Sequence, residues 1–375
     1  MSLTIDSDFD GGNIRCLAAP APDAIRLEIV PDAGGEFYQW FYFRVAGAAG
    51  EDCVLRIENA GGAAYTDGWK DYRACASEDG EDWLRVATEY DGTVLTIRHR
   101  PAGDAVRFAY FAPYPMAQHD RLIARAARSP LVTARRLGET LDGAPLDLLE
   151  IGGAQARTCW IIGRQHPGET MAEWWMEGFL ERLLDPSDAL AQVLLGKARF
   201  FVVPNMNPDG SRRGHLRTNA AGVNLNRAWA APSMAKSPEV FLVGAEMART
   251  GVDFCLDVHG DEALPYNFIA GPEGIPSYSK ALARKLARFQ AALVAANPDF
   301  QTEYGYPPTP PGKADLRICA NYVAETFGCL AMTLEMPFKD AANAPDPRYG
   351  WSPARSHRLG RSCLEALAAV IDEQR

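Results

Sequence analysis

Two residues that commonly bind metal ions lie three positions apart in one short stretch, His166-Pro-Gly-Glu169. The stretch follows an apolar run at 159–162, which predicts a buried strand, and precedes residues 171–184, whose apolar positions recur at helical spacing. An imidazole and a carboxylate on one strand-to-helix turn can face the same point, as two ligands of a zinc ion do. The same spacing also fits a surface histidine followed by the first glutamate of a helix. A metal site therefore requires a third ligand and a catalytic partner.

Candidates for both stand at the ends of two other apolar runs. His259 follows the run 254–258, and the run 330–334 ends at Glu335. In open α/β sheets, active-site residues gather just beyond the carboxyl ends of the strands. His259 would complete a His₂Glu ligand set, which in catalytic zinc sites leaves a fourth position for water. Glu335 is the candidate general base for that water.

A long polar segment, 205–227, follows the apolar run 198–203 and contains groups that would suit a peptide substrate. Arg217 could stabilise the oxyanion of a tetrahedral intermediate. Asn226 and Arg227 could hold a free carboxylate, since guanidinium binds carboxylate through two hydrogen bonds. We expect His215, in the same segment, to be solvated.

The elements that must position these groups change character along the chain. Residues 1–113 contain short alternating or aromatic-rich runs separated by turn residues, which predicts an all-β antiparallel sandwich domain. Residues 114–375 alternate strand and helix patterns, which predicts an α/β domain with a mixed, largely parallel sheet and helices on both faces. In this second domain we expect helices at 116–128, 171–184, 238–249, 278–296 and 356–374.

Length and composition agree with two globular domains. The chain has 375 residues, 47% of them hydrophobic, and a net charge of −10. This charge argues against nucleic acid or an anionic membrane as a partner. The first ten residues lack the basic and apolar regions of a signal peptide, and no apolar run approaches the ~18 residues that span a bilayer. The eight cysteines are scattered, several within apolar runs, so we expect reduced cysteines and a cytoplasmic protein.

With these residues assembled, the sequence resembles the zinc metallocarboxypeptidases, and most closely their cytosolic carboxypeptidase branch. The resemblance covers about residues 116–340 and rests on five motifs in the family's order: His166-Pro-Gly-Glu169, Asn207-Pro-Asp-Gly210, Arg217 with Asn224-Leu-Asn-Arg227, Asp257-Val-His259 and Thr333-Leu-Glu335. The cytosolic branch also carries a β-sandwich domain before the catalytic one, which matches the β-rich first 113 residues.

The resemblance implies one Zn²⁺ per chain, bound by His166, Glu169 and His259. It implies that the substrate is the C-terminus of a peptide or protein and that the reaction follows the promoted-water route. From the matching positions in the family's motifs, the resemblance implies that Glu335 is the general base and then the general acid. It also implies that Arg217 polarises the scissile carbonyl. It likewise implies that Asn226 and Arg227 hold the C-terminal carboxylate.

Two departures from the family pattern concern groups beside the site. Many relatives have Asp where this chain has Asn224, in a position thought to orient the first zinc histidine. Digestive relatives place a mobile tyrosine where this chain has Lys313, so Tyr322, Tyr304 or Tyr306 would have to replace it.

The preference for the terminal side chain is expected to depend on residues near Ala320 and Asn321, neither of which is acidic. Lys313 and Arg317 lie close in sequence and could form a basic cluster for C-terminal Glu or Asp. The cytosolic branch is known for removing glutamates, so both lines predict a preference for acidic C-terminal residues.

Two other functions fit the same residues. An N-acyl amino acid deacylase would use similar zinc ligands and an Asn-Arg clamp, but such enzymes generally lack an N-terminal β-sandwich. A non-catalytic peptide-binding protein on the same fold would not need the full set of polar residues that this sequence has.

Overall fold

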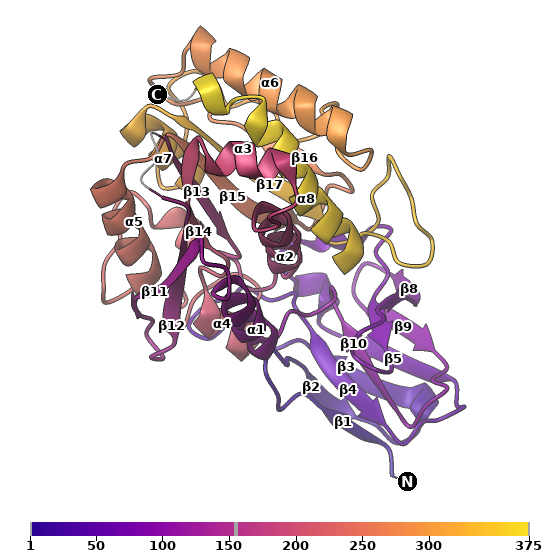
Figure 1. Ribbon diagram of the computed structural model, residues 1–375. Helices are drawn as coiled ribbons and strands as arrows, with labels where there is room; N and C mark the ends of the chain where they lie inside the picture. The colour runs from indigo at the N-terminus through magenta and orange to yellow at the C-terminus, as the bar shows by residue number, and fades with distance from the viewer. Residues whose placement is uncertain (1, 154–156, 374–375) are drawn as a thin grey trace.

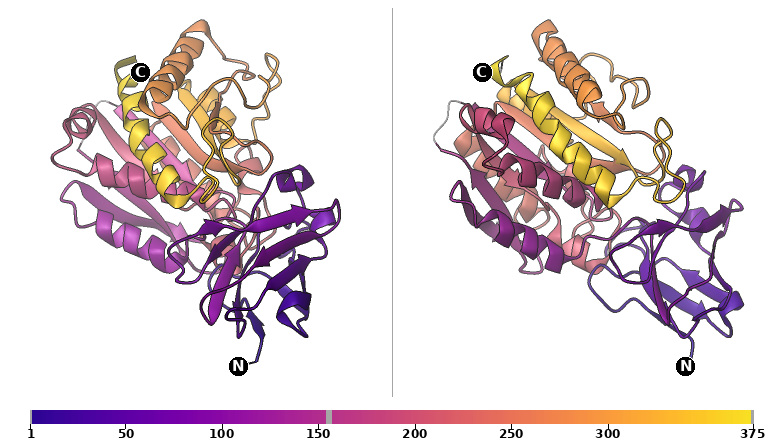
Figure 2. Two further views of the ribbon diagram at one scale, coloured as in Figure 1. Left: turned by 90° about the vertical axis from the view of Figure 1, so that its right-hand side faces the viewer. Right: turned by 45° about the vertical axis from the view of Figure 1, so that its right-hand side comes forward.

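The computed structural model describes residues 2–153 and 157–373, which form a β-rich N-terminal domain beside a larger α/β domain (Figure 1). The N-terminal domain packs against one end of the α/β domain, and the chain passes from one to the other before α1 (Met116–Ala126) (Figure 2).

The N-terminal domain contains two five-stranded sheets. The first has the order β1 (Thr4–Asp6), β4 (Tyr42–Ala46), β10 (Ala105–Ala109), β6 (Cys75–Ser77) and β7 (Leu84–Arg85). The second has the order β2 (Arg15–Ala18), β3 (Ile25–Glu28), β5 (Cys53–Ile57), β9 (Leu95–His99) and β8 (Ala87–Tyr90). Short 3₁₀ turns occupy Pro22–Ala24, Ala60–Gly62 and Thr66–Trp69.

Every strand pair in this domain is antiparallel except β3–β5, which is parallel. The exception follows from the chain path: the segment between β3 and β5 crosses to the other sheet to form β4, and parallel neighbours require such a crossover. Alternate side chains of both sheets are buried, among them Leu27 and Leu55 in one sheet and Phe43 and Phe108 in the other. The rings of Phe43 and Phe108 stack with centroids 5.6 Å apart.

The α/β domain is built on one seven-stranded mixed sheet. Its order is β11 (Val132–Glu139), β12 (Pro145–Ile151), β14 (Ala198–Val203), β13 (Arg157–Gly163), β15 (Phe254–Asp261), β17 (Leu330–Pro337) and β16 (Phe268–Ala270). The four central strands from β14 to β17 are parallel, and the outer strands are antiparallel to their neighbours. The parallel strands read as continuous apolar runs because helices cover both faces.

Helices flank this sheet on both sides (Figures 1 and 2). One face carries α2 (Met171–Leu183), α3 (Ala189–Leu195) and α8 (Pro353–Ala368), with α6 (Lys280–Ala296) packed against α8. The other carries α5 (Pro238–Thr250) and α7 (Cys319–Phe327). Further short helices are α4 (Pro208–Arg213) and the 3₁₀ turns Leu225–Arg227 and Ile371–Glu373.

Sequence patterns predicted the long helices to within a few residues but missed α3, α4 and α7, which are short. The expected helix at 356–374 instead begins at Pro353, and Gln374 lies outside the described residues. Among the described residues, no helix combines the length and apolar character that crossing a membrane requires.

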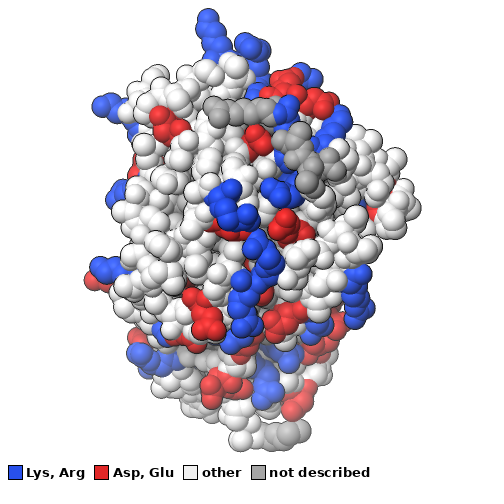
Figure 3. All heavy atoms as spheres, turned by 60° about the vertical axis from the view of Figure 1, so that its left-hand side comes forward, with Lys and Arg blue, Asp and Glu red and all other residues white. Residues whose placement is uncertain are grey.

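The edge strand β11 carries a charged side chain that forms ion pairs with neighbouring elements. Arg135 on this strand forms ion pairs with Glu150 of β12 and Glu246 of α5. Figure 3 views this side of the molecule and shows basic and acidic side chains interspersed. Charged side chains at a sheet edge discourage pairing with a further strand.

The register of the parallel strands sets the position of the site. Val258 of β15 pairs with Gly163 at the end of β13, and His259 pairs with Glu335 of β17. The stretch that begins at Arg164 therefore leaves the sheet at the level where His259 and Glu335 lie on neighbouring strands.

Candidate active site

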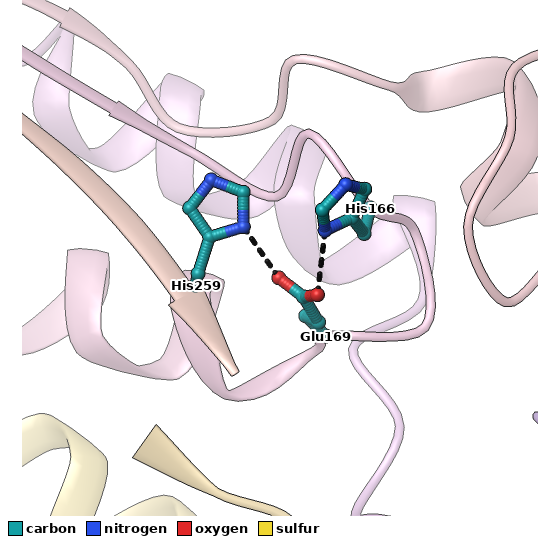
Figure 4. Close-up of side chains that lie close together, drawn as sticks. All are labelled: His166, Glu169 and His259. Carbon is teal, nitrogen blue, oxygen red and sulfur yellow. Dashed lines mark hydrogen bonds and ion pairs between the residues drawn. The ribbon is translucent and has the colours of Figure 1, made fainter. Parts of the chain in front are cut away.

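Three potential metal ligands meet at the carboxyl edge of the sheet. His166 and Glu169 lie on the loop between β13 and α2, and His259 lies on β15 (Figure 4). His166 Nδ1 is 2.6 Å from Glu169 Oε1, and His259 Nδ1 is 2.8 Å from Glu169 Oε2. One ligand atom from each residue lies within 4.8 Å of the other two. Two imidazoles and a carboxylate that converge in this way fit the donor set of a catalytic zinc ion.

The opposite ring nitrogens of both histidines have polar partners. His166 Nε2 is 3.0 Å from Asn224 Oδ1, and His259 Nε2 is 2.9 Å from Asp257 Oδ2. Such partners fix the ring orientation and leave Nδ1 as the nitrogen directed at the cluster, as in known metal sites. Asn224 therefore occupies the position in which an orienting Asp was expected from the relatives.

The loop that carries His166 begins with a strained residue. Arg164 has φ +54°, which is uncommon for a residue other than glycine. Its guanidinium donates to Pro167 O at 2.9 Å and Tyr114 O at 2.8 Å, and it pairs with buried Glu173. These contacts hold the backbone conformation that turns His166 toward Glu169.

Glu335 faces the cluster from β17 and is 7% exposed. Its Oε2 is buried with no hydrogen-bond partner among the described residues. Its Oε1 lies 3.5 Å from the hydroxyl of Tyr306, which also donates to Asp261 Oδ2 at 2.5 Å. Of the three tyrosines considered from the sequence, Tyr306 is the one whose hydroxyl lies beside Glu335.

Arg217 lines the same pocket as the cluster. Its guanidinium carbon is 5.3 Å from the ring centre of Tyr65 and 5.9 Å from that of Phe37. The negative charges nearest to it include Glu262, Glu169 and Glu335. A cation so placed can stabilise negative charge that develops on a carbonyl beside Glu335.

Asn226 and Arg227 line the same opening. The Asn226 side-chain oxygen accepts a hydrogen bond from the Cys319 backbone N–H at 2.8 Å. Its NH₂ group lies 3.4 Å from His259 Nε2 and has a second hydrogen that it can donate to a ligand. Arg227 is exposed, and one of its terminal nitrogens donates to Asn226 O at 2.7 Å. The remaining donors of both side chains can bind a carboxylate.

These groups line one pocket of about 470 Å³. Its wall also contains Tyr65, Asp261, Glu262, Glu273, Tyr306, Ala320, Asn321 and Thr333. Lys313, Arg317 and Tyr322 do not belong to this lining. Arg317 pairs with its neighbour Asp315 at 2.8 Å and is exposed, and Tyr322 packs against Trp229. The basic cluster expected from the sequence is therefore not formed in the pocket.

Burial controls the protonation of the site. Burial and the nearby Arg217 lower the pKa of His166 to about 4, which favours the neutral imidazole that a metal ion requires. Burial raises the pKa of Glu335 well above its ordinary value, and the carboxylates of Glu169, Asp261 and Glu262 raise it further against the opposing effect of His259. Burial likewise raises the pKa of Glu262 to about 8.

Sequence reasoning missed several pocket residues. Asp261 and Glu262 lie two and three positions after the candidate ligand His259 at a strand end, so their position was a usable signal. Tyr65 comes from the N-terminal domain, where no local pattern marks it. His215 was expected to be solvated, but it is 4% exposed and bonded to Thr218 O and the Ala33 N–H, each at 3.0 Å.

Comparison with known proteins agrees with this geometry. Residues 5–111 match the cytosolic carboxypeptidase N-terminal domain, and residues 121–343 match the zinc carboxypeptidase family. A metallo-carboxypeptidase from Pseudomonas aeruginosa, solved in complex with (2-guanidinoethylmercapto)succinic acid, is 47% identical. It superimposes with a TM-score of 0.97 over 99% of this chain and 100% of its own.

Curated relatives extend the comparison. An uncharacterised protein of Zymomonas mobilis is 51% identical over 100% of this chain and 98% of its own length. Cytosolic carboxypeptidase 1 of Mus musculus is 26% identical over 72% of this chain, which corresponds to 26% of the mouse protein. The chain thus spans about a quarter of that relative's length. Together, the match over residues 121–343 and the His-Glu-His cluster at the sheet edge show that the chain belongs to the zinc carboxypeptidase family and is a metallocarboxypeptidase.

Proposed function

We propose that this enzyme binds one zinc ion through His166, Glu169 and His259 and hydrolyses the C-terminal peptide bond of peptides or proteins. The proposal rests on one observation: four groups of residues line the same pocket. The metal-ligand cluster, Glu335, Arg217 and the Asn226/Arg227 pair all border one pocket of about 470 Å³. Relatives named cytosolic carboxypeptidases support a cytoplasmic location as part of this proposal.

The residues divide the reaction between them. Arg227 and Asn226 bind the substrate carboxylate and so place the last peptide bond beside Glu335. Glu335 takes a proton from the attacking water and then donates it to the leaving amine. Arg217 faces the carbonyl oxygen and stabilises its negative charge. A bound zinc ion would supply the Lewis acidity that polarises the carbonyl and makes water a nucleophile at neutral pH.

The buried environment of Glu335 suits its role. A carboxylate whose pKa is raised accepts a proton more readily than an ordinary glutamate, and the unpartnered Oε2 offers a site for that proton. The Tyr306 hydroxyl donates its one hydrogen to Asp261, and its oxygen, 3.5 Å from Oε1, can accept a hydrogen bond from Glu335 once that side chain is protonated.

The expected preference for acidic C-terminal residues loses one of its two lines of support, because Lys313 and Arg317 lie outside the pocket lining. The only cations among the described lining residues are Arg217 and Arg227, and both already have roles in the proposal. Glu273 is half-buried in the same wall. We therefore propose that neutral or basic terminal side chains bind better than acidic ones. The Pseudomonas aeruginosa relative was solved with a ligand that combines a succinic acid with a guanidino group, which fits this charge pattern.

The test compares one peptide with a free and with an amidated C-terminus, using zinc-loaded protein. We expect the amidated form to be cleaved roughly 10²-fold more slowly, since it cannot form charge-assisted hydrogen bonds with Arg227. The Arg227→Gln variant should narrow this difference, while Arg317→Gln should leave it unchanged. Equal cleavage of both peptides would overturn the proposal. Hydrolysis of N-acetyl amino acids without cleavage of longer peptides would instead identify a deacylase.

A peptide series that ends in Glu, Leu or Lys tests the side-chain preference. We expect the peptide ending in Glu to have the lowest kcat/KM, and Glu273→Gln to reduce the kcat/KM of the Lys peptide more than that of the Leu peptide. Fastest cleavage of the Glu peptide by the wild-type enzyme would show the opposite preference.

A further inference from the structure

A turn of the N-terminal domain binds the backbone of the segment that carries Arg217. The carboxylate of Asp32, which is 2% exposed, accepts hydrogen bonds from the backbone N–H groups of Leu216, Arg217 and Thr218 at 2.6, 2.8 and 2.8 Å. The Thr218 hydroxyl donates a fourth at 2.9 Å. Hydrogen bonds to an ionised carboxylate are stronger than those between neutral groups. One N-terminal side chain thus fixes three consecutive residues of the other domain.

Neighbouring contacts extend this attachment. The Ala33 N–H donates to His215 Nε2 at 3.0 Å, and Asn13 donates from Nδ2 to Gly214 O at 2.8 Å. The Gly11 N–H donates to Arg212 O at 2.9 Å. The N-terminal domain therefore contacts residues 212–218 as a continuous stretch.

The same segment is bonded to the loop that carries two metal ligands. The Gly168 N–H donates to Leu216 O at 3.0 Å, and a Cβ added to Gly168 would lie 2.9 Å from that oxygen. Gly168 is thus required for close approach to Leu216. The Leu216 peptide connects Asp32 on one side with the His166–Glu169 loop on the other.

The guanidinium of Arg217 is also contacted by the N-terminal domain. Phe37 and Tyr65 place their rings 5.9 and 5.3 Å from it, within the range of cation–π attraction. No ion pair within 4.0 Å joins Arg217 to a carboxylate in the described part of the chain, although Glu262 and Glu335 are near. The rings and the anchored backbone hold the side chain while its charge remains available for a substrate.

We propose that the N-terminal domain is an integral part of the active site, in which Asp32 is a positioning residue that fixes Arg217 and Phe37 and Tyr65 form the wall against its guanidinium. This inference rests on the proposed function, in which Arg217 stabilises an oxyanion. Asp32 touches no substrate and acts through the backbone of residues 216–218. A preorganised donor needs no reorganisation during the reaction, so loss of Asp32 should slow catalysis more than it weakens binding.

The test is a double-mutant cycle of Asp32→Asn with Arg217→Ala, with Glu28→Gln as the matched control. Glu28 lies in the same domain and, within the described part of the chain, forms its ion pair with exposed Arg15 at 3.4 Å. Asp32→Asn alone should lower kcat about tenfold with a much smaller change in KM, since removal of a whole oxyanion donor lowers kcat by about 10²–10³. In the Arg217→Ala background, Asp32→Asn should change kcat less than about twofold. Equal losses in both backgrounds, or no loss in the wild-type background, would overturn the inference.

Amide hydrogen exchange gives a readout that does not depend on activity. Exchange at residues 216–218 should be faster in Asp32→Asn and unchanged in Glu28→Gln. Unchanged exchange in Asp32→Asn would overturn the role of Asp32 even if every peptide assay succeeded. If wild-type enzyme cleaved no free C-terminus, the proposed function would fail, while the exchange experiment would still decide whether Asp32 restrains the segment.

Should Asp32→Asn fail to fold, Tyr65→Leu replaces it in the same cycle. If Tyr65 acts by holding the Arg217 guanidinium, Tyr65→Leu should lower kcat in the wild-type background and leave kcat unchanged in the Arg217→Ala background. Additive losses would contradict a role exerted through Arg217.

Discussion

Two buried histidine–glutamate pairs have their glutamates four positions apart in the chain, and one of the two pairs forms part of the candidate metal site. In the first, His119 Nδ1 of α1 is 2.6 Å from Glu173 Oε1 of α2. In the second, His166 Nδ1 is also 2.6 Å from Glu169 Oε1. All four side chains are buried. Pair distance and burial therefore do not distinguish a metal site from a structural ion pair.

The difference lies in the other partners. Glu173 is also paired with Arg164 and accepts a hydrogen bond from Asn205 at 2.9 Å, so both of its oxygens are bound by fixed donors. Burial lowers the pKa of His119, but the carboxylates of Glu173 and Asp147 outweigh this effect and raise the pKa to about 9. The result is a charged network, none of whose members lines the pocket.

Glu169 instead has a second imidazole, that of His259, and a backbone donor, Gly260 N–H, at 3.0 Å. Its cluster borders the pocket that also contains Glu335. The His166–Glu169 pair thus differs from the His119–Glu173 pair in two ways: a second imidazole converges on its glutamate, and its cluster borders a pocket that a substrate can enter.

The largest effect is expected from removing one histidine of each pair. His166→Ala removes a ligand, so bound zinc should fall from one per chain to nearly none, with loss of hydrolysis. His119→Ala should retain zinc and lose stability instead. Metal analysis of both dialysed variants, together with urea unfolding, makes the comparison. Zinc loss in His119→Ala without unfolding would contradict the distinction between the two pairs.

Glu173→Gln tests the charged network. Removing this charge leaves Arg164 buried without its main anion, and breaking a buried ion pair from one side destabilises by roughly 3–5 kcal/mol. The free energy of unfolding from urea titration measures the effect. Glu181→Gln, two turns along the same helix, is the control and should change stability by less than about 1 kcal/mol, because Glu181 is exposed and pairs with Arg361 at the surface. Equal changes in both variants would remove the special role of Glu173.

Glu239 is a buried carboxylate that forms no ion pair with a cation among the described residues. It therefore tests what burial does to a carboxylate that has no ion-pair partner. It accepts hydrogen bonds from Asn219 at 3.2 and 3.3 Å, and burial raises its pKa to about 7. Since the folded-state pKa lies above the unfolded value, the protonated form stabilises the fold at low pH. That contribution is lost as the pH rises through 7.

Glu239→Gln should therefore gain stability relative to wild type by roughly 2–3 kcal/mol between pH 5 and pH 8. Unfolding titrations of both proteins at the two pH values give this difference, and effects of zinc binding cancel in the comparison. A difference that does not depend on pH would mean that Glu239 stays ionised.

The smallest expected effect concerns Asn224, which lies 3.0 Å from His166 Nε2. Asn224→Asp restores a charged partner and should increase the basicity of the imidazole. Zinc affinity should then rise about tenfold, at the lower end of the effects known for such partners. Competition with a chelator measures this affinity. Asn224→Ala should weaken binding, and unchanged affinity in both variants would show that this hydrogen bond does not tune the metal.

Sequence patterns were sufficient to predict site residues that stand at the end of a recognisable strand. His259 and Glu335 stand directly at the ends of apolar strands, so the carboxyl-edge rule placed them on one side of the sheet. The short helix α7 was not predicted. Its first residue, Cys319, is fixed by Asn226, which lies 93 positions earlier in the chain.

The contacts that could not be read from the sequence include one local ion pair and several between distant segments. Lys313 and Arg317 are close in sequence to pocket residues, but Arg317 finds its partner two positions away in Asp315. Asp32 has the sequence context of an ordinary turn residue, and its donors lie 184 to 186 positions later. Tyr306 reaches Glu335 because the loop that carries it folds back over the pocket, which no periodicity indicates.

The central claim is that a zinc ion at the His-Glu-His cluster and the Glu335 carboxylate act together on a C-terminal peptide bond. The most direct test measures zinc content and peptide hydrolysis in the same preparations of wild type and Glu335→Gln. We predict one zinc per chain in both proteins and a loss of hydrolysis of roughly 10²–10⁴-fold in the variant. Absence of zinc from active wild-type protein, or unchanged hydrolysis by Glu335→Gln, would contradict the claim.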